Sequence, residues 1–157
     1  MSAAAATAGA LAVDAIQREI LLEELANIVV SLRGPAREPW EELAAAVDAG
    51  EVEEPLLGRL ETVLEMTLQT GRTRRIHGAD NEQALLRLFH QTPRGAAARR
   101  ATQAVNETLA SLAGQRIEGM VFTVQSPGVY RFGLNTDRCR LTLEIDPHGV
   151  SVESLEV

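Results

Sequence analysis

The chain of 157 residues contains no lysine, a single cysteine and few aromatic side chains, which make up 3% of its residues. One cysteine, Cys139, excludes an intrachain disulfide framework and leaves no thiolate cluster for a metal. The scarcity of aromatic residues removes most stacking platforms for single-stranded nucleic acid. The absence of lysine leaves all 15 basic positions to arginine and indicates no function by itself.

Long hydrophobic runs are also missing. No run approaches the roughly 20 apolar residues that a bilayer-spanning helix needs. The alanine-rich residues 1–11 have no basic residue ahead of their apolar stretch, which is not typical of a secretory signal, and we expect them to form a flexible lead-in. The sequence therefore predicts a cytoplasmic protein with no membrane partner.

The residues that are present favour helices in the first two thirds of the chain. Across residues 12–115, apolar side chains recur at three- and four-residue spacing, and proline and glycine interrupt the pattern. Asp80 with Gln83 is typical of a capping pair at the start of a helix, and Thr92 followed by Pro93 is typical of a helix N-cap. The expected helices span residues 12–32, 39–50, 55–70, 81–91 and 93–113.

From residue 116 onward the hydrophobic period changes from helical to alternating, which is typical of β-strands. Four strands are predicted, and residues 126–129 and 146–149 have the composition of tight turns. A four-stranded meander of residues 116–157 needs a helix against its apolar face, supplied by the first or the fifth helix. We therefore predict an α+β fold in which helices and meander form one compact unit.

A search for catalytic chemistry finds no motif. His77, His90 and His148 lie far apart in the sequence, without the spacing of a metal-binding motif, and we expect no metal and no cofactor. Glycine-rich phosphate loops and a serine nucleophile elbow are absent. A small enzyme whose site is assembled from scattered residues stays an alternative.

Charge is segregated along the chain, whose formal net charge is -7. Residues 1–66 hold 13 acidic and 4 basic side chains, whereas residues 67–116 hold 3 acidic and 8 basic ones. We expect the basic segment to bind a partner or an anion, which could be the acidic helices of the same chain, a second copy, an external acidic surface or phosphate. A solvated connector is the other interpretation. The candidate residues are Arg72, Arg74, Arg75, His77, Arg94, Arg99 and Arg100.

These observations favour a non-catalytic protein–protein interaction module, such as an adaptor, an assembly factor or a regulatory subunit. The expected partners are a second copy, bound through the long first helix or an edge of the sheet, and an unidentified protein with an acidic surface. The alternative is a nucleic-acid-binding regulator that resembles a winged helix and uses the arginines of residues 72–100. The low isoelectric point and the acidic first third of the chain argue against that alternative.

Overall fold

The computed structural model describes residues 9–157, so most of the expected lead-in lies outside the described residues. The fold is α+β, as the sequence predicts, with helices first and a four-stranded antiparallel sheet after them. Packing divides the chain into two compact units between residues 95 and 96. The division expected at residue 115 separates helices from strands, whereas the division by packing lies inside the last helix.

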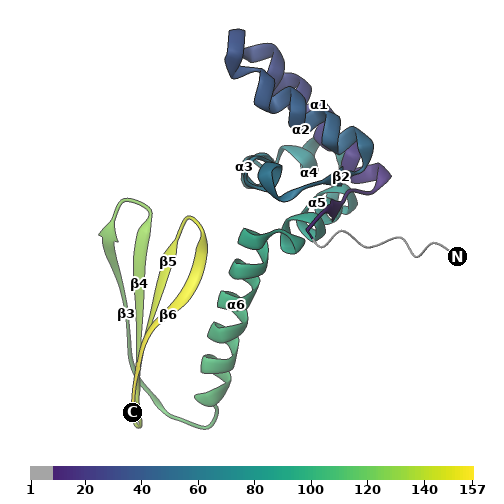
Figure 1. The fold of residues 1–157 in the computed structure, drawn as a ribbon. Coiled ribbons are helices and arrows are strands. Elements are labelled where there is room, and N and C mark those ends of the chain that lie inside the picture. The colour runs from purple at the N-terminus through teal and green to yellow at the C-terminus, as the bar shows by residue number, and fades with distance from the viewer. Residues whose placement is uncertain (1–8) are drawn as a thin grey trace, which may run out of the picture. The chain divides into compact units, whose positions relative to one another are not determined.

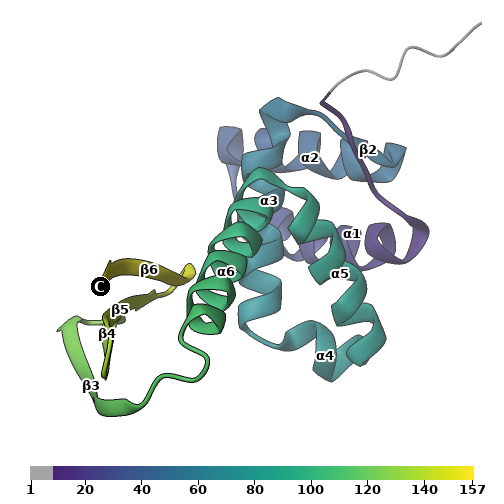
Figure 2. The ribbon, with the colours of Figure 1, turned by 90° about the horizontal axis from the view of Figure 1, so that it is seen from below.

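Unit 1, which ends at residue 95, is a group of helices with a two-stranded antiparallel sheet (Figures 1 and 2). The sheet pairs β1 (Leu11–Ala12) with β2 (Glu51–Val52). A short 3-10 helix, η1, covers Gly34–Ala36. The α-helices are α1 (Ala15–Ser31), α2 (Glu38–Ala49), α3 (Glu54–Gln69), α4 (Arg72–His77) and α5 (Ala79–Gln91).

Three helix starts differ from the sequence prediction. Helix α1 begins at residue 15, behind an Asp14 capping box, because residues 11 and 12 pair with β2 instead. Residues 72–77 form the helix α4 and not a loop, since Gly71 adopts a left-handed conformation (φ 61°) that lets a second helix follow α3. Asp80 lies inside the first turn of α5 and does not cap it, because that helix already begins at residue 79.

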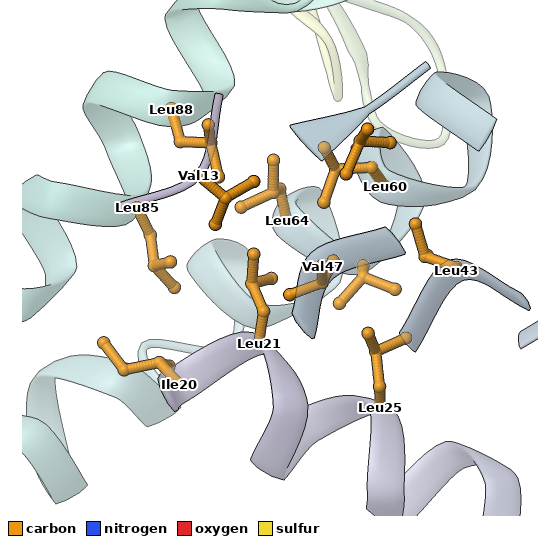
Figure 3. Packing of buried hydrophobic residues seen from close by; sticks show 12 residues of the cluster. Val13, Ile20, Leu21, Leu25, Leu43, Val47, Leu60, Leu64, Leu85 and Leu88 are labelled. Carbon is orange, nitrogen blue, oxygen red and sulfur yellow. The ribbon is translucent and has the colours of Figure 1, made fainter. Parts of the chain in front are cut away.

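The core of unit 1 is closed on several sides. Leucine, isoleucine and valine side chains of α1, α2, α3 and α5 converge on one another (Figure 3). Leu21, Leu43, Leu64 and Leu85 are among those with no exposed surface. Burying a side chain of this size contributes about 1.5–3 kcal/mol, so this cluster is the main stabilising feature of unit 1.

Unit 2 contains most of α6 (Pro93–Ser111) and the sheet of β3 (Ile117–Ser126), β4 (Val129–Thr136), β5 (Arg140–Asp146) and β6 (Gly149–Glu156). The strands pair in chain order, as a meander. Gly128 has the positive φ (81°) expected in the first turn, and Leu141 and Leu143 are the buried positions of β5. Val105 of α6 is buried with them, so α6, the expected fifth helix, covers the sheet.

The length and composition of the helices bear on the expectation that the chain has no membrane partner. Among residues 9–157, none of the helices combines the length and the apolar composition needed to cross a bilayer.

Candidate interaction site

The basic segment 72–77 lies against carboxylates of the same unit. Arg72 Nε is 3.2 Å from an oxygen of Glu24 on α1, and Arg74 Nε is 3.1 Å from an oxygen of Glu82 on α5. The Nε2 atom of His77 is 3.2 Å from Glu23. Helix α4 therefore lies between carboxylates of α1 and α5, and the contacts of Arg72, Arg74 and His77 with them are close approaches without aligned hydrogen bonds.

One of the carboxylates that meet this basic segment is buried. The side chain of Glu24 is 9% exposed, while that of Arg72 is 43% exposed. Because a buried carboxylate is costly without a counterion, Arg72 acts as the outer half of a structural ion pair. Glu24 is thus one of the buried residues of α1, although its neighbour Glu23 is exposed.

Arg94 has the same role at the start of α6. Its backbone N–H donates to Glu61 Oε1 at 2.7 Å, and its guanidinium contacts both Glu61, whose side chain is 6% exposed, and Glu65. A carboxylate at a helix N-terminus is further stabilised by the helix dipole. Thr92 caps the same helix, since its Oγ1 accepts from the N–H of Gly95, as the sequence predicts.

The seven candidate residues therefore fall into two groups. Arg72, Arg74, His77 and Arg94 meet carboxylates of the same chain, which was one of the partners left open by the sequence. Arg75 is exposed and donates to the Thr70 carbonyl, and Arg99 and Arg100 are exposed on α6. Among residues 9–157, the three arginines of this second group are exposed and form no ion pair with a carboxylate of the chain.

A second surface, which the sequence analysis missed, lies on β3. Met120, Phe122 and Val124 are 65%, 59% and 67% exposed. By register they stand beside Leu134, Phe132 and Tyr130 of β4 and thus belong to the apolar face of the sheet. The buried core of unit 2 is built from α6, β4 and β5, with partly buried side chains of β6 packed against it, and β3 supplies none of its members. We call Met120, Phe122 and Val124 the β3 stripe.

The width of the sheet explains why the β3 stripe is uncovered. A helix with its side chains is about 10–12 Å across. Four strands about 4.8 Å apart place the outer two about 14 Å from each other, so one helix cannot cover the whole face. Figure 1 shows α6 beside the β6 side of the sheet and β3 at the edge farthest from α6.

The two edges of this sheet differ in charge. Edge strand β3 has one charged residue, Glu118, at its start, and residues 119–126 are uncharged. The outer strand β6 has Glu153 and Glu156, and charged side chains are a common protection against edge-to-edge association. Register shifts next to residues 118 and 125 leave a regular run of residues 119–124 on β3. This run is an unprotected edge, and the uncharged alternation in the sequence is the signal that could have identified it.

Other features of the described residues add no chemistry. Within residues 9–157, no three or more His, Cys, Asp or Glu side chains are grouped so that they could hold a metal ion. A pocket of unit 1 is lined by three glutamates and by apolar residues. The lining residues are Glu42, Ala46, Ala49, Glu51, Glu53, Pro55 and Leu56.

Comparison with models of protein families, with curated proteins and with solved structures finds no match to this chain.

Proposed function

We propose that the chain is a non-catalytic protein–protein interaction module that acts by associating with a second copy of itself. The observation that supports this proposal is the exposure of the β3 stripe on an uncharged sheet edge. Complete burial of a valine, phenylalanine or methionine side chain contributes about 1.5–3 kcal/mol. Pairing along this edge removes part of these three side chains from water in each copy and joins the free backbone groups of the two edges, which supports a specific, reversible contact.

The sheet edge is a better contact surface than the long first helix, which the sequence left as an equal alternative. The apolar stripe of α1, which includes Ile20, Leu21 and Leu25, is buried inside unit 1 and is not available to a second copy. The large apolar side chains that α1 leaves exposed are Ile16 and Val30. These two stand 14 positions apart in the helix and do not form a continuous patch.

A charged surface is the second part of the proposal. Arg75 of unit 1 is exposed, and so are Arg99 and Arg100 of unit 2, and each unit could meet an acidic protein partner through bidentate contacts to carboxylates. The nucleic-acid alternative receives less support, because several arginines on which it relied are paired with carboxylates that would repel phosphate. No feature of the site favours the alternative of an enzyme.

The experiment is a measurement of mass by light scattering over a range of protein concentrations. We expect the wild-type chain to pass from monomer to dimer in the micromolar range. The double variant Met120→Thr/Val124→Thr places β-branched, strand-favouring threonines at both positions and removes much of the exposed apolar surface, so it should stay monomeric at those concentrations.

The matched control is Val30→Thr, which makes the same chemical change at an exposed position of α1. This variant should dimerise as the wild type does. A wild-type mass that stays monomeric at every concentration would overturn the proposal, and so would loss of the dimer in Val30→Thr but not in the double variant.

A further inference from the structure

From the geometry of the free edge we infer how two copies would join: β3 of each copy pairs antiparallel with β3 of the other, with Phe122 opposite its own symmetry mate. The inference rests on the proposed self-association and gives it a surface, a symmetry and a register. The product is one continuous sheet made from two four-stranded sheets, with the apolar faces of both on the same side.

Charge favours a second copy at this edge over the other possible edge contacts. Each chain has a net charge of -7, so two copies repel each other in most orientations. Residues 119–126 are uncharged, and pairing two copies there brings no like charges together. Pairing two β6 strands would instead bring Glu153 and Glu156 of one copy beside those of the other, which is unfavourable.

Symmetry separates the β3 pair from a mixed contact. If β3 paired with β6 of a second copy, each copy would keep one free edge, and addition would continue into an open filament. A contact between two β3 strands is related by a two-fold axis and closes after two copies. Closed two-fold dimers are the commonest assembly of soluble proteins, and this edge permits one.

The register follows from keeping the apolar faces continuous. Residues opposite each other in an antiparallel pair point to the same face, so the apolar positions of one copy must stand opposite apolar positions of the other. A two-fold axis located at a residue meets this condition. An axis located between two consecutive residues would pair each apolar position with a position on the other face. An axis at Phe122 places Met120 opposite Val124 and pairs the whole β3 stripe. An axis at Val121 would place Val124 opposite Glu118, in the irregular start of the strand.

The size of the contact sets its strength. With the axis at Phe122, the regular part of each strand pairs over residues 120–124, a length of about 17 Å. A contact of one short strand falls in the range of small interfaces, below about 1,200 Å², that is typical of weak and transient complexes. A reversible dimer is therefore expected, and not an obligate one.

The test uses disulfide formation between the full-length chains to read the register. In a Cys139→Ser background, two variants are prepared, Val121→Cys and Thr123→Cys. With the axis at Phe122, residue 121 of one copy stands opposite residue 123 of the other on the face that α6 does not cover. Directly opposite Cβ atoms are about 4.5–5.5 Å apart and diagonal ones about 7–8 Å, and a disulfide needs about 3.5–4.5 Å.

We expect an equal mixture of the two variants to form the covalent heterodimer under mild oxidation, roughly tenfold or more faster than either variant alone forms a homodimer, given these distances. Light scattering of the reduced variants provides the control that each still dimerises. Faster crosslinking of Val121→Cys alone would move the axis to Val121 and overturn the register.

Two other outcomes separate this inference from the proposed function. If the reduced variants dimerise but no combination forms a disulfide, self-association stands and the β3 pairing is wrong. If neither the wild-type chain nor the variants dimerise, both fail. Faster crosslinking in the presence of an added peptide with the sequence of residues 117–126 would also contradict the pairing, because a second β3 should compete for the edge.

Discussion

The two units of this chain differ in how completely they bury their apolar side chains. Unit 1 surrounds its core with helices on several sides, and most of the buried leucines and valines there have no exposed surface. Unit 2 places one helix on one face of a four-stranded sheet, and its buried core consists of Val105, Leu134, Leu141 and Leu143. A single helix is too narrow for four strands, so unit 2 leaves apolar surface at its edge.

The charges of the two units show the same difference. Unit 1 places two carboxylates, Glu24 and Glu61, in buried positions and satisfies each with an arginine from another helix. In unit 2 the ion pair of Arg131 with Glu153 joins β4 to β6, the strands on either side of β5, where both side chains are partly exposed. Unit 1 therefore pairs its two buried carboxylates within the chain, whereas unit 2 leaves the β3 stripe exposed.

The largest effect is expected from opening the closed core. Leu64→Ala removes a side chain with no exposed surface and should lower the free energy of unfolding by about 2–5 kcal/mol, through lost burial and the cavity left behind. Trp40, the single tryptophan, packs against this core, so its fluorescence during urea unfolding follows unit 1. Met66→Ala, at a half-exposed position two residues along α3, is the control and should cost much less. Equal losses of stability in Leu64→Ala and Met66→Ala would contradict the account of unit 1 as a closed core.

A smaller but still large effect is expected at the buried ion pair. Arg72→Glu places a second carboxylate beside the buried Glu24 and should cost about 2–4 kcal/mol of stability, somewhat below the roughly 3–5 kcal/mol of a fully buried pair because Arg72 is 43% exposed. Arg75→Glu makes the same change three positions away, where the side chain is exposed and meets the Thr70 carbonyl. That variant should unfold within about 0.5 kcal/mol of the wild type. Similar midpoints for both in urea would show that Arg72 has no structural role.

The next largest effect on stability is expected at the junction between α5 and α6. A Cβ atom on Gly95 would overlap the backbone carbonyl of Phe89, so Gly95→Ala forces the two helices apart and should cost about 1–3 kcal/mol. Gly58 lies in α3 with open space around the position of its missing Cβ. Gly58→Ala should therefore stabilise the protein by about 0.5–1 kcal/mol, from helix propensity alone. Thermal unfolding followed by circular dichroism compares the two, and the same sign for both would contradict this account.

The smallest effect is expected where unit 2 is open. Met120→Thr replaces a side chain that is mostly exposed, so the stability of the monomer should change by no more than about 0.5 kcal/mol. The measurement is urea unfolding followed by far-ultraviolet circular dichroism, at a concentration low enough to keep the wild type monomeric. A loss of stability as large as that of Leu64→Ala would mean that the β3 stripe is covered within the chain, and the contrast between the units would disappear.

Local signals in the sequence were enough to locate most elements. Thr92 followed by Pro93 marked the start of α6, and Gly128 marked the first turn of the meander, because each satisfies a backbone requirement within a few residues. Along the third predicted strand, Cys139, Leu141, Leu143 and Ile145 alternate with polar residues, and of these four Leu141 and Leu143 are buried while Cys139 and Ile145 are partly exposed. Where a nearby residue competed for the same role, the local signal failed, as when Gly78 and not Asp80 came to precede α5.

The sequence by itself determined the α+β class, the order of helices and strands, and the segregation of positive charge, since these depend on periodicity and composition along the chain. Only the tertiary structure decided which partner meets that charge, because Glu24 and Glu61 face Arg72 and Arg94 only after distant helices pack. It also decided that the β3 stripe is exposed while Leu141 and Leu143 of β5 are buried. Both strands contain large apolar side chains, and the difference in their burial arises from the limited width of the one helix that packs on their sheet.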